Sequence, residues 1–269
     1  MKRKDFKSMT KRFGFTLAEV LITLGIIGVV AAMTIPTLVA NTNGAKFRSQ
    51  FKKTLSTLNQ AGLMAQAQYD FDYAGLNAAC NGTVANAAKE DPTSDLTMCA
   101  LLNGTLTGHS YIGAASNLKD SASNAYKFNN AEGGKALTLN TADDYNVYTL
   151  ADGSVVGFPS AMAGGCTLQL GQVVNTDTLK AGTKDETTGA ITGAGGLNGC
   201  IGFIDVNGVT LPNKEVSCSG DGTAALTPET PCAVKNNATN LTDIFPVVFH
   251  DATVEPATNA AKYVLTSTK

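Results

Sequence analysis

The first 71 residues show three successive patterns of polar and apolar positions. Residues 1–14 are basic, residues 15–38 are apolar with few interruptions, and residues 39–71 place an apolar side chain at every third or fourth position. The apolar stretch is long enough to cross a hydrocarbon core of about 30 Å as a helix that rises about 1.5 Å per residue. The spacing that follows is typical of an amphipathic helix. The pattern predicts one long helix over 15–71, whose first part, 15–38, spans a membrane.

Pro36 lies inside the predicted helix and separates its two halves. Proline has no N–H to donate and crowds the carbonyl group four residues earlier, so a kink or a melted turn is expected there. Before it, Gly25 and Gly28 lack side chains and allow other helices to approach closely. After it, the apolar face is expected to cover a globular head. That face consists of Phe47, Phe51, Leu55, Leu58, Gly62, Ala65 and Tyr69.

Residues 72–269 are rich in Gly, Asn, Thr and Ala and are interpreted as the head. Residues 72–140 are expected to be mainly loops, with one or two short helices around 95–102. Residues 147–150 and 155–158 are apolar and flank a turn that contains a glycine, which predicts a β-hairpin.

Two further strand signals follow in the head. Residues 200–206 and 209–211 flank Asn207-Gly208, a dipeptide typical of hairpin turns. Residues 243–249 predict another strand, in which Pro246 indicates an edge position or an irregularity. An antiparallel sheet packed against the long helix is the simplest arrangement, so the predicted fold class is α+β.

Charge is distributed unevenly along the chain. The 269 residues include 20 Lys and Arg against 22 Asp and Glu, and only 16% of residues are charged. This composition excludes a polybasic nucleic-acid binder and an acidic disordered chain, so no nucleic-acid partner is evident. Residues 1–14 nevertheless carry six basic side chains and one acidic side chain. A basic stretch before an apolar segment stays on the cytoplasmic side, which places the head outside the cytoplasm.

Glu19 is an ionisable group inside the apolar stretch. An acid at mid-membrane costs about 2.5–3.5 kcal/mol on insertion scales, so a positive partner is expected at the same depth. A cut after Gly14 creates such a partner, because Phe15 then carries a free α-amino group one helical turn before Glu19. Within one chain or between neighbouring chains, this pair sets the register of packed helices.

The basic leader, Gly14 and the sequence FTLAEVLITLGIIG resemble the class III signal of type IV prepilins and type II secretion pseudopilins. The resemblance implies that a prepilin peptidase cleaves after Gly14 and methylates Phe15. It also implies that Glu19 and Pro36 serve assembly. The implied protein is a structural subunit, held in the inner membrane with its head outside. It then stacks with other pilin subunits, on an assembly platform, into a periplasmic or cell-surface filament.

In the head the resemblance is weaker and follows LADGSVVGF, GFIDVNGVTLPNK and DIF, with an interruption at 215–240. Some pseudopilins bind calcium in a C-terminal loop, so the resemblance also suggests candidate calcium ligands. The simpler interpretation is that these residues serve as turn residues, so neither a metal nor a cofactor is expected. The candidates are Asp205, Asn207, Asn213 and Asp243.

The six cysteines all lie in the head, and none forms a C-x-x-C pair. This spacing argues against a zinc site and against a redox motif. Many pairings are open in principle, but sequential pairing is expected because each pair closes a short Gly-rich segment without a core of its own. The expected disulfides are Cys80–Cys99, Cys166–Cys200 and Cys218–Cys232.

No catalytic function is predicted. His109 and His250 are the only histidines, and the chain has neither a G-x-S-x-G nor an H-E-x-x-H motif. The glycine-rich residues 193–199 lack the strand and helix of a nucleotide-binding loop and are expected to form a flexible turn.

Two other interpretations remain open at the level of the sequence. The leader is also compatible with an ordinary secretory signal cleaved after Ala32, or with an uncut membrane anchor. The whole chain is also compatible with a membrane-tethered or secreted protein that binds a ligand, a surface or DNA. The carboxylate at Glu19 argues against the first of these, because an ordinary signal has no reason to keep it. The second is distinguished by whether the protein co-purifies with sheared filaments.

Overall fold

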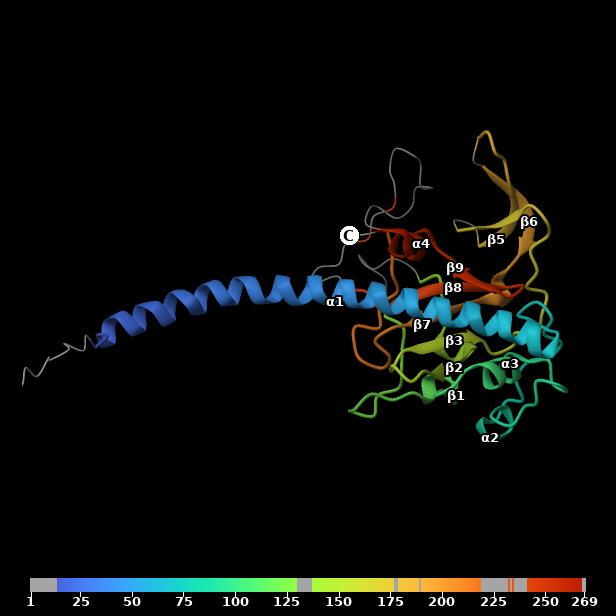
Figure 1. Ribbon diagram of the computed structural model, residues 1–269, viewed down its shortest axis with the longest axis horizontal. Helices are drawn as coiled ribbons and strands as arrows, with labels where there is room; N and C mark the ends of the chain where they lie inside the picture. The colour runs from blue at the N-terminus through green and yellow to red at the C-terminus, as the bar shows by residue number, and fades with distance from the viewer. Residues whose placement is uncertain are drawn as a thin grey trace, which may run out of the picture.

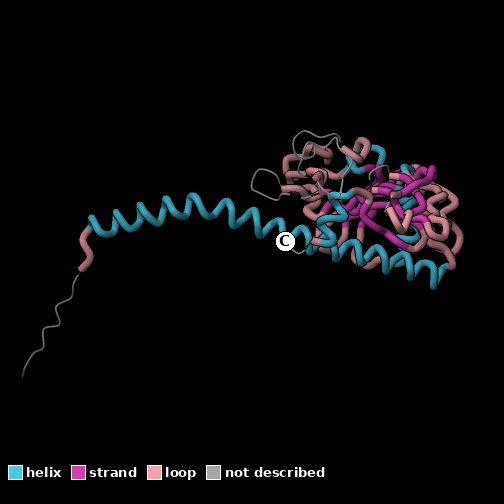
Figure 2. Tube along the Cα trace, turned by 90° about the horizontal axis from the view of Figure 1, so that it is seen from above, coloured by secondary structure: helices cyan, strands magenta, loops and turns pink. Residues whose placement is uncertain are grey.

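The computed structural model describes residues 14–129, 137–176, 179–188, 190–218, 232, 234 and 241–267. It consists of one long helix and a head built on an antiparallel sheet, which confirms the predicted α+β class (Figure 1). The first half of the helix projects away from the head, and the second half lies along it (Figures 1 and 2).

Helix α1 (Leu17–Tyr69) begins after an N-cap at Thr16 and ends at Asp70, which has a left-handed φ of 60°. These bounds lie close to the predicted 15–71. The helix is continuous through Pro36, so the melted turn expected there is wrong, and Figure 2 shows a smooth curve instead. A long helix absorbs one missing N–H donor by curving, because the turns on both sides keep their hydrogen bonds.

Six strands form the main sheet in the order β1-β2-β3-β7-β8-β9, and all neighbours are antiparallel. The hairpin predicted from residues 147–150 and 155–158 is confirmed as β2 and β3. The strands are β1 (Ser110–Ala114), β2 (Tyr145–Thr149), β3 (Val155–Pro159), β7 (Ile201–Asp205), β8 (Ile244–His250) and β9 (Thr253–Pro256).

A smaller antiparallel sheet is inserted between β3 and β7 and projects from the head (Figure 1). It contains β4 (Gln172–Asn175), β5 (Lys180–Lys184) and β6 (Ile191–Gly196). Strand β6 occupies part of the segment 193–199, so the flexible turn expected there is wrong. Pairing with β5 orders this segment, whereas its glycines carry no strand signal in the sequence.

Three short α-helices lie in the described part of the head, beside three single-turn 3-10 helices. Helix α3 (Met98–Thr105) agrees with the helix expected around 95–102. Helices α2 (Val84–Ala87) and α4 (Asn259–Thr266), like strand β1, were not predicted from the sequence.

The hairpin predicted at Asn207-Gly208 is wrong, because residues 207–212 form turns and bends that no strand follows. Strand β7 already pairs with β3 on one side and with β8 on the other, so no free edge is left for 209–211. The side chain of Asn207 instead donates to the carbonyl oxygen of Thr210 at 2.9 Å and stabilises the turn.

Pro246 lies in an interior strand, so the predicted edge position is wrong. Its carbonyl oxygen accepts from the amide of Ala257 at 3.0 Å, and the N and C=O of one residue point to the same side of an antiparallel strand. The missing N–H therefore faces β9 just beyond the last pair, Val247–Pro256. The proline falls where the ladder ends, and the sheet tolerates it.

The second half of α1 is attached to the sheet by both polar and aromatic contacts. The side-chain amide of Asn59 donates to the carbonyl of Val254 at 2.9 Å and accepts from its N–H at 2.8 Å. One helical side chain thus satisfies both backbone groups of a residue in the edge strand β9. Nearby, the rings of Phe51 and Phe245 stack with centroids 4.3 Å apart. These contacts fix the direction in which the first half of α1 leaves the head.

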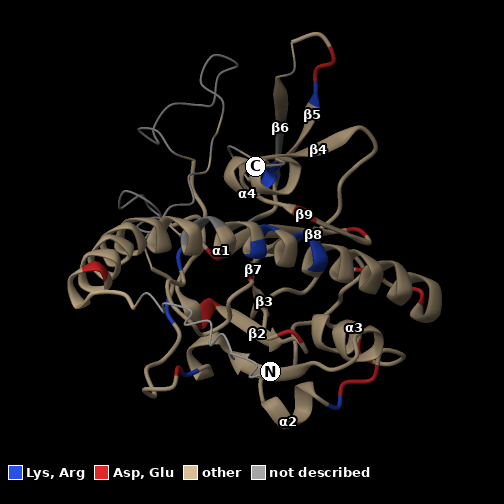
Figure 3. Cartoon of the chain, turned by 60° about the vertical axis from the view of Figure 1, so that its left-hand side comes forward, with Lys and Arg blue, Asp and Glu red and all other residues tan. Residues whose placement is uncertain are grey.

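Basic residues lie on the part of α1 that is drawn beside β7 and β8 (Figure 3). Lys53 Nζ lies 2.9 Å from Asp152 Oδ2, in the turn between β2 and β3. The lysine is largely exposed, so the pair contributes less than about 1 kcal/mol. Its main consequence is to orient the hairpin turn against the helix.

Gly202 provides a test of the packing between β3 and β7. A Cβ at this position would lie 2.1 Å from the carbonyl oxygen of Gly157. We expect Gly202→Ala to lower the free energy of unfolding by about 1–3 kcal/mol, because the backbone of the neighbouring strand must shift. Denaturant titration of the full chain in detergent micelles measures this. Gly199→Ala is the matched control, since a Cβ there meets nothing within 4 Å, and equal losses in both variants would contradict the prediction.

Candidate functional site

The first half of α1 exposes a continuous apolar surface. None of the 18-residue apolar window in this helix is buried by the described chain, and by length and composition the helix could cross a membrane. Leu17 is 80% exposed, and the large apolar side chains that follow it, up to Val39, are exposed as well. An apolar surface of this size is typical of a membrane or protein contact. The surface therefore needs a partner that the head does not supply.

Glu19 is held by the residue that caps its own helix. Glu19 Oε2 accepts from both the backbone N–H and the hydroxyl of Thr16, each at 2.8 Å, and the amide of Glu19 donates to Thr16 Oγ1 at 3.2 Å. This reciprocal arrangement is a capping box. In the described part of the chain Glu19 forms no ion pair, so neutral donors alone satisfy its carboxylate. This role of Thr16 was not predicted from the sequence, although the Thr-x-x-Glu spacing signals it.

Gly14 and Phe15 lie outside the helix and are free of the head. A Cβ at Gly14 would meet nothing within 4 Å, and Phe15 is 89% exposed. The fold therefore does not require glycine at position 14. Phe15 directly precedes Thr16, so an α-amino group created at Phe15 would lie beside the residue that already binds Glu19. Cleavage and methylation at this junction remain predictions.

Gly25 and Gly28 are also free of contacts within the chain, since a Cβ at either position would meet nothing within 4 Å. No contact within the described part of the chain therefore requires a glycine at either position. It leaves a flat strip on the exposed surface of α1, where another helix can approach closely.

The four candidate calcium ligands come together where β7 ends and β8 begins. Asp205 and Asp243 are completely buried. Asp205 Oδ1 accepts from the amide of Asn207 at 2.9 Å, and its Oδ2 accepts from the hydroxyl of Tyr126 at 2.5 Å. Burial raises the pKa of Asp205 well above its usual range, and the nearby charge of Asp243 raises it further.

Both carboxylate oxygens of Asp243 also accept hydrogen bonds from the protein. Its Oδ2 accepts from the amide of Asn213 at 3.1 Å, and its Oδ1 accepts from the amide of Lys214 at 2.8 Å. Burial raises the pKa of Asp243 to about 7, although these N–H groups favour the charged form. All four carboxylate oxygens of the pair already accept hydrogen bonds from the protein. The residues therefore act as buried acceptors for turns, whereas a calcium site at them stays only a suggestion of the resemblance.

A second buried titratable group, His250, lies at the end of β8. Its Nδ1 is 3.0 Å from Asp251 Oδ2, and its Nε2 is 3.1 Å from Glu255 Oε1. Burial lowers the pKa of His250, but the two carboxylates more than offset this and raise it overall. The imidazolium thus joins both sides of the β8–β9 hairpin. Sequence analysis did not assign this role.

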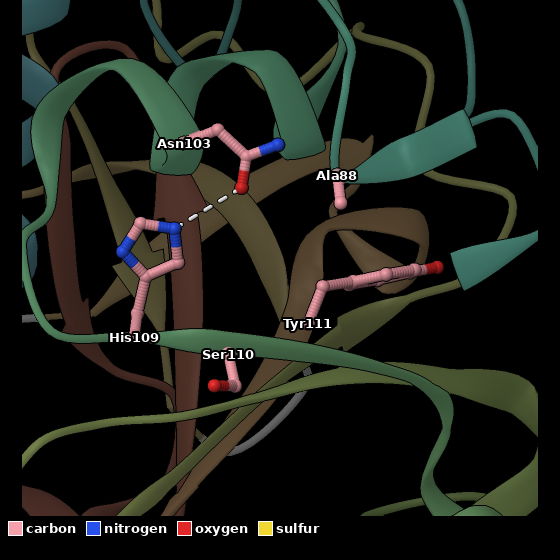
Figure 4. A pocket seen from close by; sticks show the side chains of 5 residues that line it. All are labelled: Ala88, Asn103, His109, Ser110 and Tyr111. Atoms are coloured by element: carbon pink, nitrogen blue, oxygen red, sulfur yellow. Dashed lines mark hydrogen bonds between the residues drawn. The ribbon is translucent and has the colours of Figure 1, made fainter. Parts of the chain in front are cut away.

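A hollow of about 450 Å³ lies between α3 and β1 (Figure 4). Asn103 Oδ1 accepts from Tyr148 at 3.0 Å and lies 3.1 Å from His109 Nε2, which must donate because an amide oxygen only accepts. Burial lowers the pKa of His109. The lining contains no carboxylate and no nucleophile hydrogen-bonded to a base. It consists of Ala88, Asn103, His109, Ser110 and Tyr111.

The cysteines pair sequentially, as the sequence analysis expected. Disulfides join Cys80 to Cys99, Cys166 to Cys200, and Cys218 to Cys232. The second disulfide links the loop after β3 to the start of β7. Disulfides of this kind stabilise a loop-rich head by restricting its unfolded chain.

The buried Asp205 and Asp243 predict a pH-dependent stability of the head. Both pKa values are raised in the folded state, so folding takes up protons and stability is lost as pH rises from about 4 through about 7. We expect the thermal midpoint of the full chain in detergent to fall over this range. Asp205→Asn should flatten the dependence, because it removes one of two repelling charges. Asp91→Asn is the control, since its pKa is lowered by Thr93. An unchanged slope in Asp205→Asn would exclude the pair as its source.

Comparison with known proteins gives one match. Residues 9–35 match the family model described as the prokaryotic N-terminal methylation motif. The matched segment includes Gly14, Phe15, Thr16 and Glu19, and it ends one residue before Pro36. No curated protein and no solved structure matches the chain. The N-terminal segment that exposes the apolar surface of α1 is therefore a class III signal, and in this segment the chain is type IV pilin-like.

Proposed function

We propose that the chain is a structural subunit, major or minor, of a type IV pilus or a type II secretion pseudopilus. One observation carries the proposal: the methylation motif coincides with an uncovered apolar half-helix that is continuous with a half-helix attached to the head. A simple membrane anchor needs no such continuity. A filament subunit does, because the position of its head must follow the position of its helix.

Processing converts the precursor into the assembling form. Prepilin peptidase cleaves between Gly14 and Phe15 and methylates the new N-terminus. The open space around Gly14 supports this assignment, because a glycine without a packing role within the chain is explained by the enzyme that must bind it. Before assembly the subunit is held in the inner membrane by α1, with its head outside the cytoplasm.

Assembly replaces lipid around α1 with the helices of other subunits. Gly25 and Gly28 allow close approach of the neighbouring helices. Glu19 pairs with the α-amino group of Phe15, either in the same or in a neighbouring subunit. The capping contact with Thr16 supports this step, because it keeps the carboxylate satisfied until the amine is available.

The first test concerns the cut. We expect mass spectrometry of the membrane-bound protein to find a mature N-terminus at methylated Phe15. Gly14→Ala should leave the precursor uncut, although the fold has room for the added methyl group. A mature N-terminus near Met33 would indicate an ordinary secretory signal, and an intact Met1 would indicate an uncut anchor.

The second test concerns Glu19. We expect Glu19→Ala to remain in the membrane fraction but to decrease at least about tenfold in sheared filaments, because one partner of a buried ion pair is lost. Glu186→Ala is the matched control, since Glu186 is an exposed acid on the head. Normal incorporation of Glu19→Ala would contradict its role in assembly. If the wild-type chain is itself absent from sheared filaments, a membrane-tethered or secreted binding protein becomes the better description.

A further inference from the structure

Glu90 is a buried carboxylate that the proposed filament role does not use. It is only 5% exposed and forms no ion pair among the described residues. Instead it accepts hydrogen bonds from the amide of Asn81 and the hydroxyl of Thr97. A buried charge is costly unless its hydrogen bonds are needed where they are made. The location of its two donors therefore indicates what Glu90 does.

The two donors belong to the two segments that carry one disulfide. Asn81 follows Cys80 directly, and Thr97 lies two residues before Cys99. A carboxylate oxygen of Glu90 and the two sulfur atoms all lie within 4.8 Å of one another. Glu90 thus clamps together the two segments whose cysteines must meet.

Thr97 connects Glu90 to the helix that contains Cys99. Its hydroxyl oxygen accepts from the amide of Ala100 at 3.1 Å and so caps α3, while its hydroxyl hydrogen is directed to Glu90. Cys99 is the second residue of the capped helix, and its amide points at the sulfur of Cys80 at 3.1 Å. The cap on α3 therefore places the backbone amide of Cys99 against the sulfur of Cys80.

We propose that Glu90 is a positioning residue that selects Cys99 as the disulfide partner of Cys80 and keeps this pair closed. A carboxylate suits this role because both of its oxygens accept, whereas a glutamine offers one acceptor. A separate backbone hydrogen bond, from Asn77 to Leu96 at 2.8 Å, holds the same segments, so loss of Glu90 weakens the pairing without abolishing it.

Formation of the Cys80–Cys99 disulfide requires an oxidant of the disulfide class, and this oxidant reacts first with Cys80. Cys80 is the less buried of the two as a residue, although it belongs to the buried group with Glu90, and Cys99 is completely buried. The Cys80 thiolate attacks the oxidant's S–S bond, forms a mixed disulfide and releases one oxidant thiolate. The Cys99 thiolate then attacks Cys80 Sγ, forms the Cys80–Cys99 bond and releases the second. The two cysteine thiols lose two electrons and two protons, and the oxidant is reduced to two thiols.

The test measures two disulfides in the same molecule. The full chain in detergent micelles is reduced, equilibrated in reduced and oxidised glutathione, alkylated and mapped by mass spectrometry. We expect Glu90→Gln to lower the equilibrium constant for Cys80–Cys99 at least about tenfold, because a hydrogen bond to a charged group is lost, while Cys166–Cys200 is unchanged. Thr97→Ser and Asp91→Asn should behave like wild type, since the first keeps the hydroxyl and the second changes only an exposed neighbour.

A trapping experiment identifies the sulfur through which exchange enters. Cys99→Ser should accumulate a glutathione adduct on Cys80, and Cys80→Ser should not accumulate one on Cys99. Parallel loss of both disulfides in Glu90→Gln would show a general structural role and overturn the proposal, as would no loss of either. Adducts of equal yield on the two cysteines would overturn the order of attack.

Discussion

The attachment of the second half of α1 to the sheet is the constraint on which the rest of this structure depends. Asn59 satisfies both backbone groups of Val254, and Phe51 stacks on Phe245, so the helix is fixed to the edge strand β9 and to its neighbour β8. The helix is continuous through Pro36. The free half is therefore an extension of a rigid element, and its direction relative to the head is determined by contacts made far from the membrane segment.

The same helix meets two environments, and its side chains differ accordingly. Beyond residue 44 one face of the helix is apolar and buried against the head, and Leu63 and Met64 lie exposed outside that face, whereas before residue 40 apolar side chains surround the helix. The only carboxylate in that first half, Glu19, accepts hydrogen bonds from Thr16 and so does not stand unsatisfied beside lipid. The hydrogen bonds from Thr16 thus satisfy the carboxylate of Glu19 within its own helix.

In the head, hydrogen bonds to buried acidic side chains supplement a core that has few large aromatic residues. The chain has no Trp, and aromatic residues account for only 7% of it. Asp205, Asp243 and Glu90 are buried and accept hydrogen bonds from loops. Each of them organises a segment with little apolar surface of its own. The disulfide Cys80–Cys99 joins the two segments that Glu90 contacts, so hydrogen bonds and a disulfide stabilise this loop-rich part of the head together.

The sequence alone determined the long helix, the β2–β3 hairpin, the sequential disulfides and the residues of the class III signal, because each is encoded within a short stretch of chain. The capping of Glu19 by Thr16 was not predicted, although its Thr-x-x-Glu spacing is equally local. Only the tertiary structure decided that Pro246 lies inside the sheet, that residues 209–211 are not a strand, and that glycine-rich residues near 193 form one. Strand pairing joins residues distant in sequence, and a strand is excluded wherever both neighbouring edges are already occupied. For the same reason the sequence grouped Asp205 with Asp243 but could not show that each of their carboxylate oxygens accepts a hydrogen bond from the protein. Nor could it show that the carboxylate of Glu90 lies within 4.8 Å of the sulfur atoms of Cys80 and Cys99.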